Sequence, residues 1–110
     1  DGYDVTIHVP ITFSQAVLGD DVEVPTVDGR IVQHIPEGTQ SGTKFRLRGQ
    51  GIQYLNGRGR GDQYVIVDVE IPKKVTRAQR EALKAFEDSM KEDNYEKRKG
   101  FFKNLRDRFS

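Results

Sequence analysis

Side chains that commonly catalyse reactions or bind metals are scarce in this sequence of 110 residues. It contains no cysteine and two histidines, His8 and His34, so thiolate nucleophiles, thiolate metal sites and disulfides are excluded. Both histidines fall at polar positions of expected strands, where an exposed imidazole is common, and the alternative is a hydrolase built on one of them. Ser14 and Ser41 lack the glycine elbow of a nucleophilic serine. We expect neither an enzyme nor a metal site.

The segment 38–44, GTQSGTK, resembles a phosphate-binding loop only in composition. Three residues instead of four separate its glycines, and threonine precedes the lysine. A strand is expected to follow, so Lys44 cannot reach a phosphate from the start of a helix. We therefore reject a nucleotide site here.

Cationic residues gather in the middle of the sequence, where Tyr54 lies among them. Arginines beside an aromatic side chain can hold single-stranded nucleic acid by phosphate contacts and stacking. Acidic residues nearby, Asp20, Asp21, Glu23 and Asp28, support the alternative in which the cations pair with their own neighbours. We favour internal pairing and keep nucleic-acid binding as the second hypothesis. The cationic cluster consists of Lys44, Arg46, Arg48, Arg58 and Arg60.

The overall charge is balanced, but its distribution is not. Lys and Arg number 18, Asp and Glu number 17, and the net charge is +1, so the whole chain is not drawn to nucleic acid or to anionic membranes. Residues 1–70 hold 6 basic and 10 acidic residues, net −4, whereas residues 71–110 hold 12 and 7, net +5. Since no apolar run approaches the ~18 residues of a membrane span, we expect a cytoplasmic protein. The start at Asp1 suggests a piece of a longer or processed chain.

Apolar and polar residues alternate with a period of two in several segments of residues 1–72, which predicts strands with one buried face. Pro10 places the first strand at an edge or a strand end, and Asp28-Gly29 predicts a hairpin turn. The last strand carries apolar residues on both faces, with Ile71 expected on the same face as Val65, which predicts a central position. The predicted strands are 5–11, 22–26, 31–35, 43–48 and 62–71, with a helical turn over 12–19 and a glycine-rich loop over 49–61.

Residues 73–110 are predicted to be helical. Thr76 and Gln79 have the spacing of an N-terminal capping box, and Gly100 is expected to interrupt the helix. Two apolar stripes at helical spacing would form a patch that soluble monomers avoid. They are covered either by the β module of the same chain or by a second copy. The stripe residues are Leu83, Phe86, Met90, Phe101, Phe102, Leu105 and Phe109.

The order of motifs resembles the C-terminal domain II of bacterial DnaJ co-chaperones. The matching segments, in chain order, are TFSQAVLG, VEVPT, the Asp-Gly hairpin, IPEGTQSG, FRLRGQG, GRGRGD and the ending FFxxLxxxF. The resemblance implies a mainly β protein with a small two-layer β-sandwich at residues 1–72 and a helical dimerisation tail at residues 73–110. It also implies a module that holds unfolded polypeptide clients for a DnaK-type ATP-driven chaperone and forms a homodimer.

Two sequence motifs of the family are missing from these 110 residues. The chain has no His-Pro-Asp tripeptide and no Cys-x-x-Cys repeat, so the J domain and the zinc-binding region of the family are absent and no cofactor is expected. An extended client could add to a sheet edge beside a shallow apolar channel. The alternative is that the channel residues are only core. By analogy with the sister domain, the client-binding candidates are Val5, Ile7, Val9, Val22 and Val24.

Overall fold

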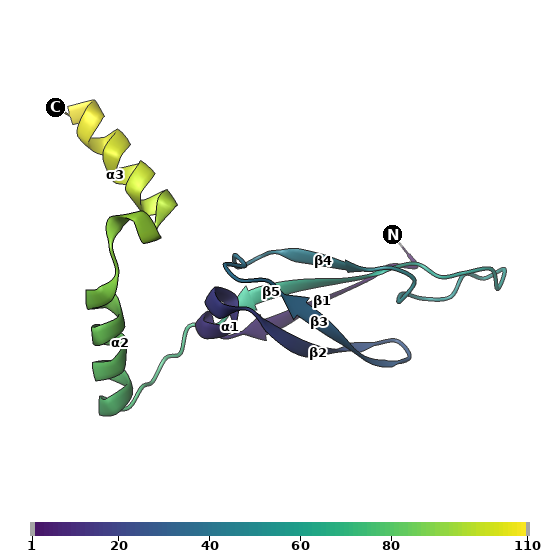
Figure 1. Cartoon of the computed structure of the whole chain (residues 1–110). Helices are drawn as coiled ribbons and strands as arrows, with labels where there is room; N and C mark the ends of the chain where they lie inside the picture. The colour runs from purple at the N-terminus through teal and green to yellow at the C-terminus, as the bar shows by residue number, and fades with distance from the viewer. Residues whose placement is uncertain (1, 110) are drawn as a thin grey trace. The chain divides into compact units, whose positions relative to one another are not determined.

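The computed structural model describes residues 2–109, and these form two units that meet between Ile71 and Pro72. We call them the β unit and the helical unit (Figure 1). The β unit contains β1 (Val5–Ile11), α1 (Phe13–Leu18), β2 (Asp20–Thr26), β3 (Gly29–Ile35), β4 (Lys44–Leu47) and β5 (Gln63–Val69). The helical unit contains α2 (Arg77–Ser89), the 3-10 turn η1 (Glu92–Asn94) and α3 (Glu96–Phe109).

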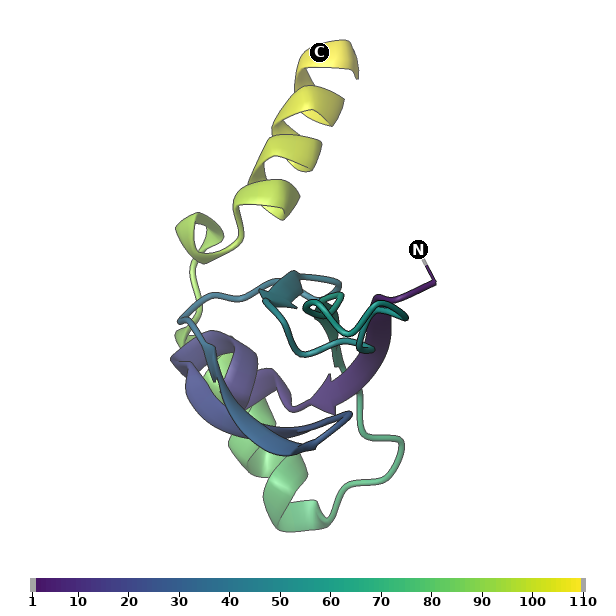
Figure 2. The same ribbon diagram turned by 90° about the vertical axis from the view of Figure 1, so that its right-hand side faces the viewer.

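Two small sheets make up the β unit. One has the order β1-β5-β4, with β1 parallel and β4 antiparallel to β5, and the other is the antiparallel hairpin β2-β3. In the end-on view of Figure 2, the hairpin curves opposite β1 as a separate layer. The predicted hairpin, the central position of β5 and the edge position of β1 are confirmed, as is a small β-sandwich followed by helices.

The core of the β unit lies between these layers. Gln63 is buried among apolar side chains, and its Nε2 donates a hydrogen bond to the Pro25 carbonyl at 2.7 Å. This bond joins β5 to β2 and satisfies a polar group that would otherwise be costly to bury. The buried apolar residues are Ile11, Ala16, Val24, Ile35, Val65 and Val67.

The helical turn α1 begins and ends as the sequence predicts. The Thr12 hydroxyl accepts a hydrogen bond from the Gln15 amide at 3.0 Å, and the Gln15 side chain accepts from the Thr12 amide at 2.9 Å, a capping box. Gly19 ends the helix with a φ of 80°, and a Cβ there would lie 2.9 Å from the Ile35 carbonyl oxygen. Glycine is therefore required where α1 turns into β2.

The predicted end of the last strand is wrong. β5 ends at Val69, and Ile71, expected on the buried face, is 73% exposed. The last bond of the ladder runs from the Glu70 amide to the Ile11 carbonyl at 2.9 Å. Beyond it Pro72 supplies no amide hydrogen, so the strand cannot continue.

The helical unit differs from prediction at one point. Thr76 and Gln79 form the predicted capping box, but the expected break at Gly100 is wrong, because α3 runs through Gly100. A glycine costs a helix only about 1 kcal/mol, which its neighbours can offset. The interruption lies instead at Met90, whose extended backbone ends α2 before η1. Within residues 2–109 no helix is long and apolar enough to cross a membrane.

Candidate functional site

Strand β1 has an open edge, because among the described strands it pairs only with β5. The Val5 amide donates to the Asp62 carbonyl at 2.9 Å, and the Ile11 carbonyl accepts from the Glu70 amide at 2.9 Å. The amide and carbonyl of one strand residue point to the same side, and successive residues alternate sides. The odd-numbered residues of β1 therefore bond to β5, and the even-numbered residues point away from it.

The open edge is formed by the backbone of Thr6, His8 and Pro10. Thr6 and His8 each offer one amide and one carbonyl, whereas Pro10 offers only a carbonyl. Pro10 is compatible with the β1–β5 ladder, since its missing amide hydrogen would point outward. An extended strand could therefore pair with the backbone of Thr6 and His8, and this pairing would end at Pro10.

Half-buried aliphatic side chains accompany this edge. Val5, Ile7 and Val9 are half-buried on the inner face of β1, and Ile7, Val9 and Val22 pack against the core. Val24 is only 1% exposed and belongs to the core, so it offers no surface to a ligand. Four of the five predicted client-site residues thus retain accessible surface.

The other sheet edges carry more charge. β4 has only four residues, and its exposed positions are Lys44 and Arg46. β2 exposes Asp21 and Glu23, together with Pro25. Short length, charge and proline are the usual protection of a sheet edge against added strands. β3, the fourth edge, has seven residues and one charged side chain, Arg30. β1, with seven residues and no Lys, Arg, Asp or Glu, is the least charged edge.

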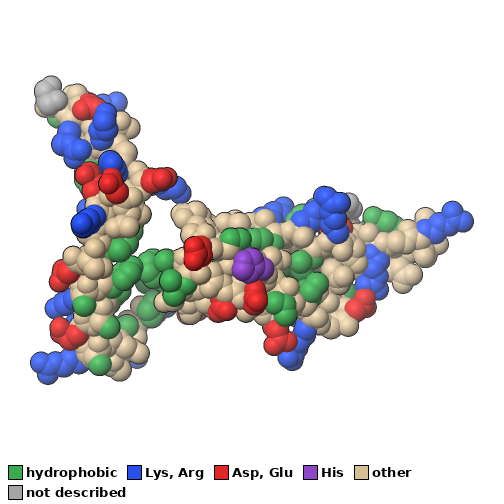
Figure 3. Space-filling model, in the orientation of Figure 1, with side chains coloured by type: hydrophobic (Ala, Val, Ile, Leu, Met, Phe, Trp, Pro, Cys, Tyr) green, Lys and Arg blue, Asp and Glu red, His purple; other side chains and the backbone are tan. Residues whose placement is uncertain are grey.

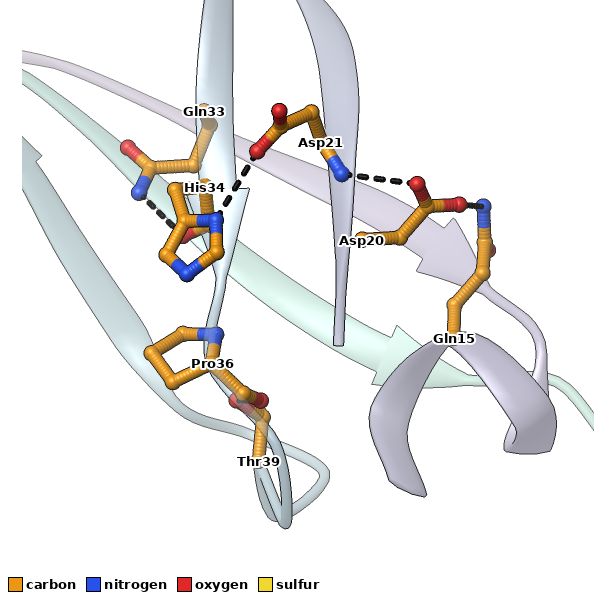
Figure 4. A network of polar contacts seen from close by, with 7 residues as sticks. All are labelled: Gln15, Asp20, Asp21, Gln33, His34, Pro36 and Thr39. Carbon is orange, nitrogen blue, oxygen red and sulfur yellow. Dashed lines mark hydrogen bonds and ion pairs between the residues drawn. The ribbon is translucent and has the colours of Figure 1, made fainter. Parts of the chain in front are cut away.

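Each histidine forms an exposed pair with an aspartate on a neighbouring strand. His8 Nδ1 lies 2.8 Å from Asp68 Oδ2, and His34 Nδ1 lies 2.8 Å from Asp21 Oδ1. Figure 4 shows His34 and Asp21 on adjacent strands of the hairpin. The exposed, hydrogen-bonded interpretation of both histidines is confirmed. Among the described residues, no group of three or more His, Cys, Asp or Glu could hold a metal ion.

Two of the five residues of the cationic cluster, Arg46 and Arg60, form ion pairs within the β unit. Arg46 Nη2 lies 2.6 Å from Asp62 Oδ2, and the Gly49 amide donates to Asp62 Oδ1 at 2.9 Å. The Gly49 hydrogen bond and the guanidinium of Arg46 together hold the pKa of Asp62 below its ordinary value of 3.8. The hydrogen bond to Asp62 and the negative charge of its carboxylate in turn raise the pKa of Arg46. The carboxylate therefore fixes the start of the glycine-rich loop.

Two further cations of the cluster have partners. Arg60 forms an ion pair with Asp28 in the β2–β3 turn, and the Lys44 ammonium lies 4.4 Å from the centre of the Tyr64 ring. Internal pairing of the cluster, favoured by the sequence, is confirmed for Arg46 and Arg60. The nucleic-acid alternative is not supported.

The helical unit leaves its apolar stripes on the surface. No residue of this unit among residues 72–109 is buried, and Met90 is half-buried. Figure 3 shows hydrophobic side chains among charged ones on this unit. A stable helix normally buries its apolar stripe, so these faces are suited to contact another polypeptide. The exposed stripe residues, between 37% and 76% accessible, are Leu83, Phe86, Phe101, Phe102, Leu105 and Phe109.

Two family models match consecutive parts of the chain. The first, described as "DnaJ C terminal domain", matches residues 1–72. The second, described as "Chaperone protein DnaJ C-terminal region", matches residues 78–110. The chain belongs to the DnaJ C-terminal domain family. The resemblance seen in the sequence motifs is thereby confirmed.

Curated DnaJ relatives match almost the whole chain. A protein named Chaperone protein DnaJ from Ruminiclostridium cellulolyticum is 52% identical over 108 residues, 98% of this chain. Proteins of the same name from Acetivibrio thermocellus and Clostridioides difficile are each 50% identical, over 106 and 109 residues. The chain spans 28% of the length of each of these DnaJ proteins.

Sequence reasoning missed two features of this DnaJ chain. Tyr95 and Arg98 line a cleft of about 340 Å³ together with Met90 and Phe102, and the Arg98 guanidinium lies 4.7 Å from the Phe102 ring centre. The cleft forms because the chain turns between α2 and α3 at η1. The sequence signal was a lone aromatic residue, Tyr95, within a polar stretch that otherwise predicts only a solvated segment.

Proposed function

We propose that this DnaJ C-terminal chain binds extended segments of unfolded polypeptide and holds two copies of the protein together, without catalysing a reaction. The open edge of β1 beside half-exposed aliphatic side chains is the observation that carries the client-binding part. The family relationship supports both parts. Residues 1–72 would bind the client, and residues 73–110 would form the dimer.

Backbone recognition explains how such a site would tolerate many clients. A client strand beside β1 would pair with the amides and carbonyls of Thr6 and His8, which are present whatever the client sequence. Alternate client side chains would contact Val5, Ile7 and Val9. Each hydrogen bond contributes only ~0.5–1.5 kcal/mol net, so binding would be weak and reversible, as suits a holding site.

The remaining steps belong to the longer protein. Because the chain spans 28% of its DnaJ relatives, we assign the transfer of clients to a DnaK-type ATP-driven chaperone to parts outside these 110 residues. We place the protein in the cytoplasm, and its relationship to the DnaJ chaperones supports this.

A proline substitution in β1 tests the client site. His8→Pro removes one outward amide and leaves the bonds to β5 intact, whereas His8→Ala removes the imidazole and keeps the amide. We expect His8→Pro to weaken binding of a carboxymethylated, permanently unfolded polypeptide by about 3- to 10-fold, with His8→Ala close to the unmodified chain. Fluorescence anisotropy measures the affinity, and circular dichroism verifies the fold. Equal binding by both variants would rule out strand addition at β1.

A further inference from the structure

We propose that the open edge of β1 prefers client segments in which lysine or arginine alternates with apolar residues, and that Asp68 is the residue that selects the basic side chains. This inference rests on the proposed client site and deepens it, because it names the class of segment that the site takes. Three features support it: the two faces of the edge, the position of Asp68 beside it, and the sign of the surrounding charges.

A strand added beside β1 would place its side chains alternately on two different faces. Its inner face would lie along the half-buried aliphatic side chains of β1. Its outer face would lie beside Thr6, His8 and Pro10, which are all exposed, because residues directly opposite in paired strands point to the same side. Apolar client residues therefore gain contacts only at every second position, and the positions between them are open to another kind of side chain.

Asp68 lies next to this outer row of β1 side chains. It is the partner of Pro10 in the parallel ladder of β1 and β5, and alternation along β5 places it on the face opposite to the buried Val67. Its Oδ2 lies 2.8 Å from His8 Nδ1, and its side chain is 49% exposed. His8 thus holds a solvent-accessible carboxylate towards the edge at which a client strand would add.

Only a long side chain of the client could reach Asp68. A client residue beside Pro10 would lie two strand spacings from Asp68, about 10 Å between the backbones. Lysine and arginine carry their charge at the end of a long apolar stem, which could extend across the proline ring to the carboxylate. A carboxylate accepts several hydrogen bonds through its two oxygens, so the contact with His8 leaves room for a second donor.

Negative charge predominates near the β1 edge. β1 contains no Lys, Arg, Asp or Glu, and Asp68 is the only such residue in β5. Lys44 and Arg46 lie on β4, and β5 separates them from β1. Glu70, exposed just beyond β5, adds a second negative charge at the same end of the edge. An acidic client side chain would be repelled here, whereas a basic one would be attracted.

Within the described part of the chain, Asp68 has no lysine or arginine partner. None of the ion pairs formed among residues 2–109 joins Asp68 to either kind of cation. Asp62, beside the start of β1, is by contrast occupied by Arg46, whose Nη2 lies 2.6 Å from Asp62 Oδ2. A basic client residue would therefore find its ion-pair partner at Asp68, near the C-terminal end of β1.

Three short fluorescent peptides test the inference on the whole chain. Each carries leucine at every second position, and the positions between are all lysine, all glutamine or all glutamate. We expect the lysine peptide to bind about 3- to 10-fold more tightly than the glutamate peptide, with the glutamine peptide between them, as measured by fluorescence anisotropy at low ionic strength. Raising the salt concentration to about 0.5 M should remove most of this preference.

A single substitution tests the role of Asp68. Asp68→Asn should reduce the preference for the lysine peptide about 2- to 5-fold. Asp21→Asn is the matched control, because Asp21 forms the same exposed contact with His34, also at 2.8 Å, on the other sheet (Figure 4). This control removes the same charge and should keep the preference. Circular dichroism verifies the fold of both variants.

The outcomes separate the selectivity from the proposed function. If the peptides bind equally, if the glutamate peptide binds most tightly, or if Asp68→Asn changes the preference no more than Asp21→Asn does, selection by Asp68 is wrong while client binding stands. If no peptide binds, or if His8→Pro leaves peptide binding unchanged, the client site at β1 and its selectivity fall together. A preference for lysine that Asp68→Asn reduces and Asp21→Asn retains supports the inference.

Discussion

The β unit and the helical unit use similar apolar residues in opposite ways. The β unit buries aliphatic side chains from both sheets, with Val24, Ile35 and Val65 almost inaccessible. The helical unit has two long amphipathic helices, yet none of its residues among 72–109 is buried. Helices of 13 and 14 residues are marginal in water without packing. The first unit therefore has a buried core of its own, whereas the helical unit has none among its described residues.

The glycines of the two units also differ in how closely other atoms pack around them. Gly51 and Gly61 lie against the backbone of Tyr3, and a Cβ on Gly61 would overlap the Tyr3 carbonyl. A Cβ on Gly100 in α3 would meet no heavy atom within 4 Å outside the backbone of its own helix. Close backbone packing therefore constrains these glycine positions of the β unit, whereas no such packing constrains Gly100 in α3.

The largest expected effect is in the core of the β unit. Ile35→Ala should lower the free energy of unfolding by ~2–5 kcal/mol, because it leaves a cavity between the two sheets. Leu83→Ala, at a 60% exposed position, should change the stability of the monomer by less than about 0.5 kcal/mol. Urea unfolding followed by circular dichroism at low protein concentration measures both. Equal losses of unfolding free energy in the two variants would contradict the contrast between the units.

Gly61→Ala should destabilise the β unit by ~1–3 kcal/mol, because the new methyl group overlaps the Tyr3 backbone and must displace it. The Ile52 amide, which donates to the Tyr3 carbonyl at 2.9 Å, should then exchange faster with solvent. Amide hydrogen exchange measured by NMR detects this change. Unchanged protection of Ile52 would show that the loop does not hold the N-terminal segment.

Asp62 should make the β unit sensitive to acid. Its pKa is lower in the folded than in the unfolded protein, so the stabilisation is present above the ordinary value of 3.8 and is lost as the pH falls through the folded value. Asp62→Asn should therefore be less stable than the unmodified chain at neutral pH, and the difference should shrink in acid. Urea unfolding between about pH 7 and about pH 3 measures it.

The matched control for Asp62 lies in the helical unit. Asp93→Asn removes an exposed ion pair with Lys99 and should leave the stability of the β unit unchanged at every pH. If the stability difference between Asp62→Asn and the unmodified chain stays constant as the pH falls, ionisation of the Asp62 carboxylate is not its cause.

The smallest expected effect is a gain in the stability of α3. Gly100→Ala should stabilise α3 by ~0.5–1 kcal/mol, because alanine loses less backbone entropy in a helix and meets no close contact at this position. Thermal unfolding followed by far-ultraviolet circular dichroism measures the change. A loss of helix content would show that the backbone at Gly100 departs from a helix.

The sequence predicted those features that depend on local patterns. Alternation located β1 and β5, Asp28-Gly29 located the hairpin turn, and Thr76 located the start of α2, because each signal lies within a few residues. The prediction of a helix break at Gly100 was wrong, since a single glycine weakens a helix without ending it. The direction of backbone groups at the β1 edge could not be predicted, because it depends on which side of β1 meets β5.

The candidate site was only partly predictable for the same reason. Val22 and Val24 have the same residue type and point to the same face of one strand, yet only Val24 is fully buried, because burial depends on where the second sheet lies. The pairing of Arg46 with Asp62 joins residues sixteen positions apart, and only the acidic composition of the region hinted at it. The family, by contrast, was evident from the order of the motifs.

Hydrogen–deuterium exchange at two protein concentrations tests the central claim most directly, because it reports on both units in one experiment. We expect amides of β5 to keep the same protection on dilution, whereas amides of α2 and α3 lose protection as the dimer dissociates. Protection of α2 and α3 that does not depend on concentration would show that the helical unit is stable by itself and would contradict the account.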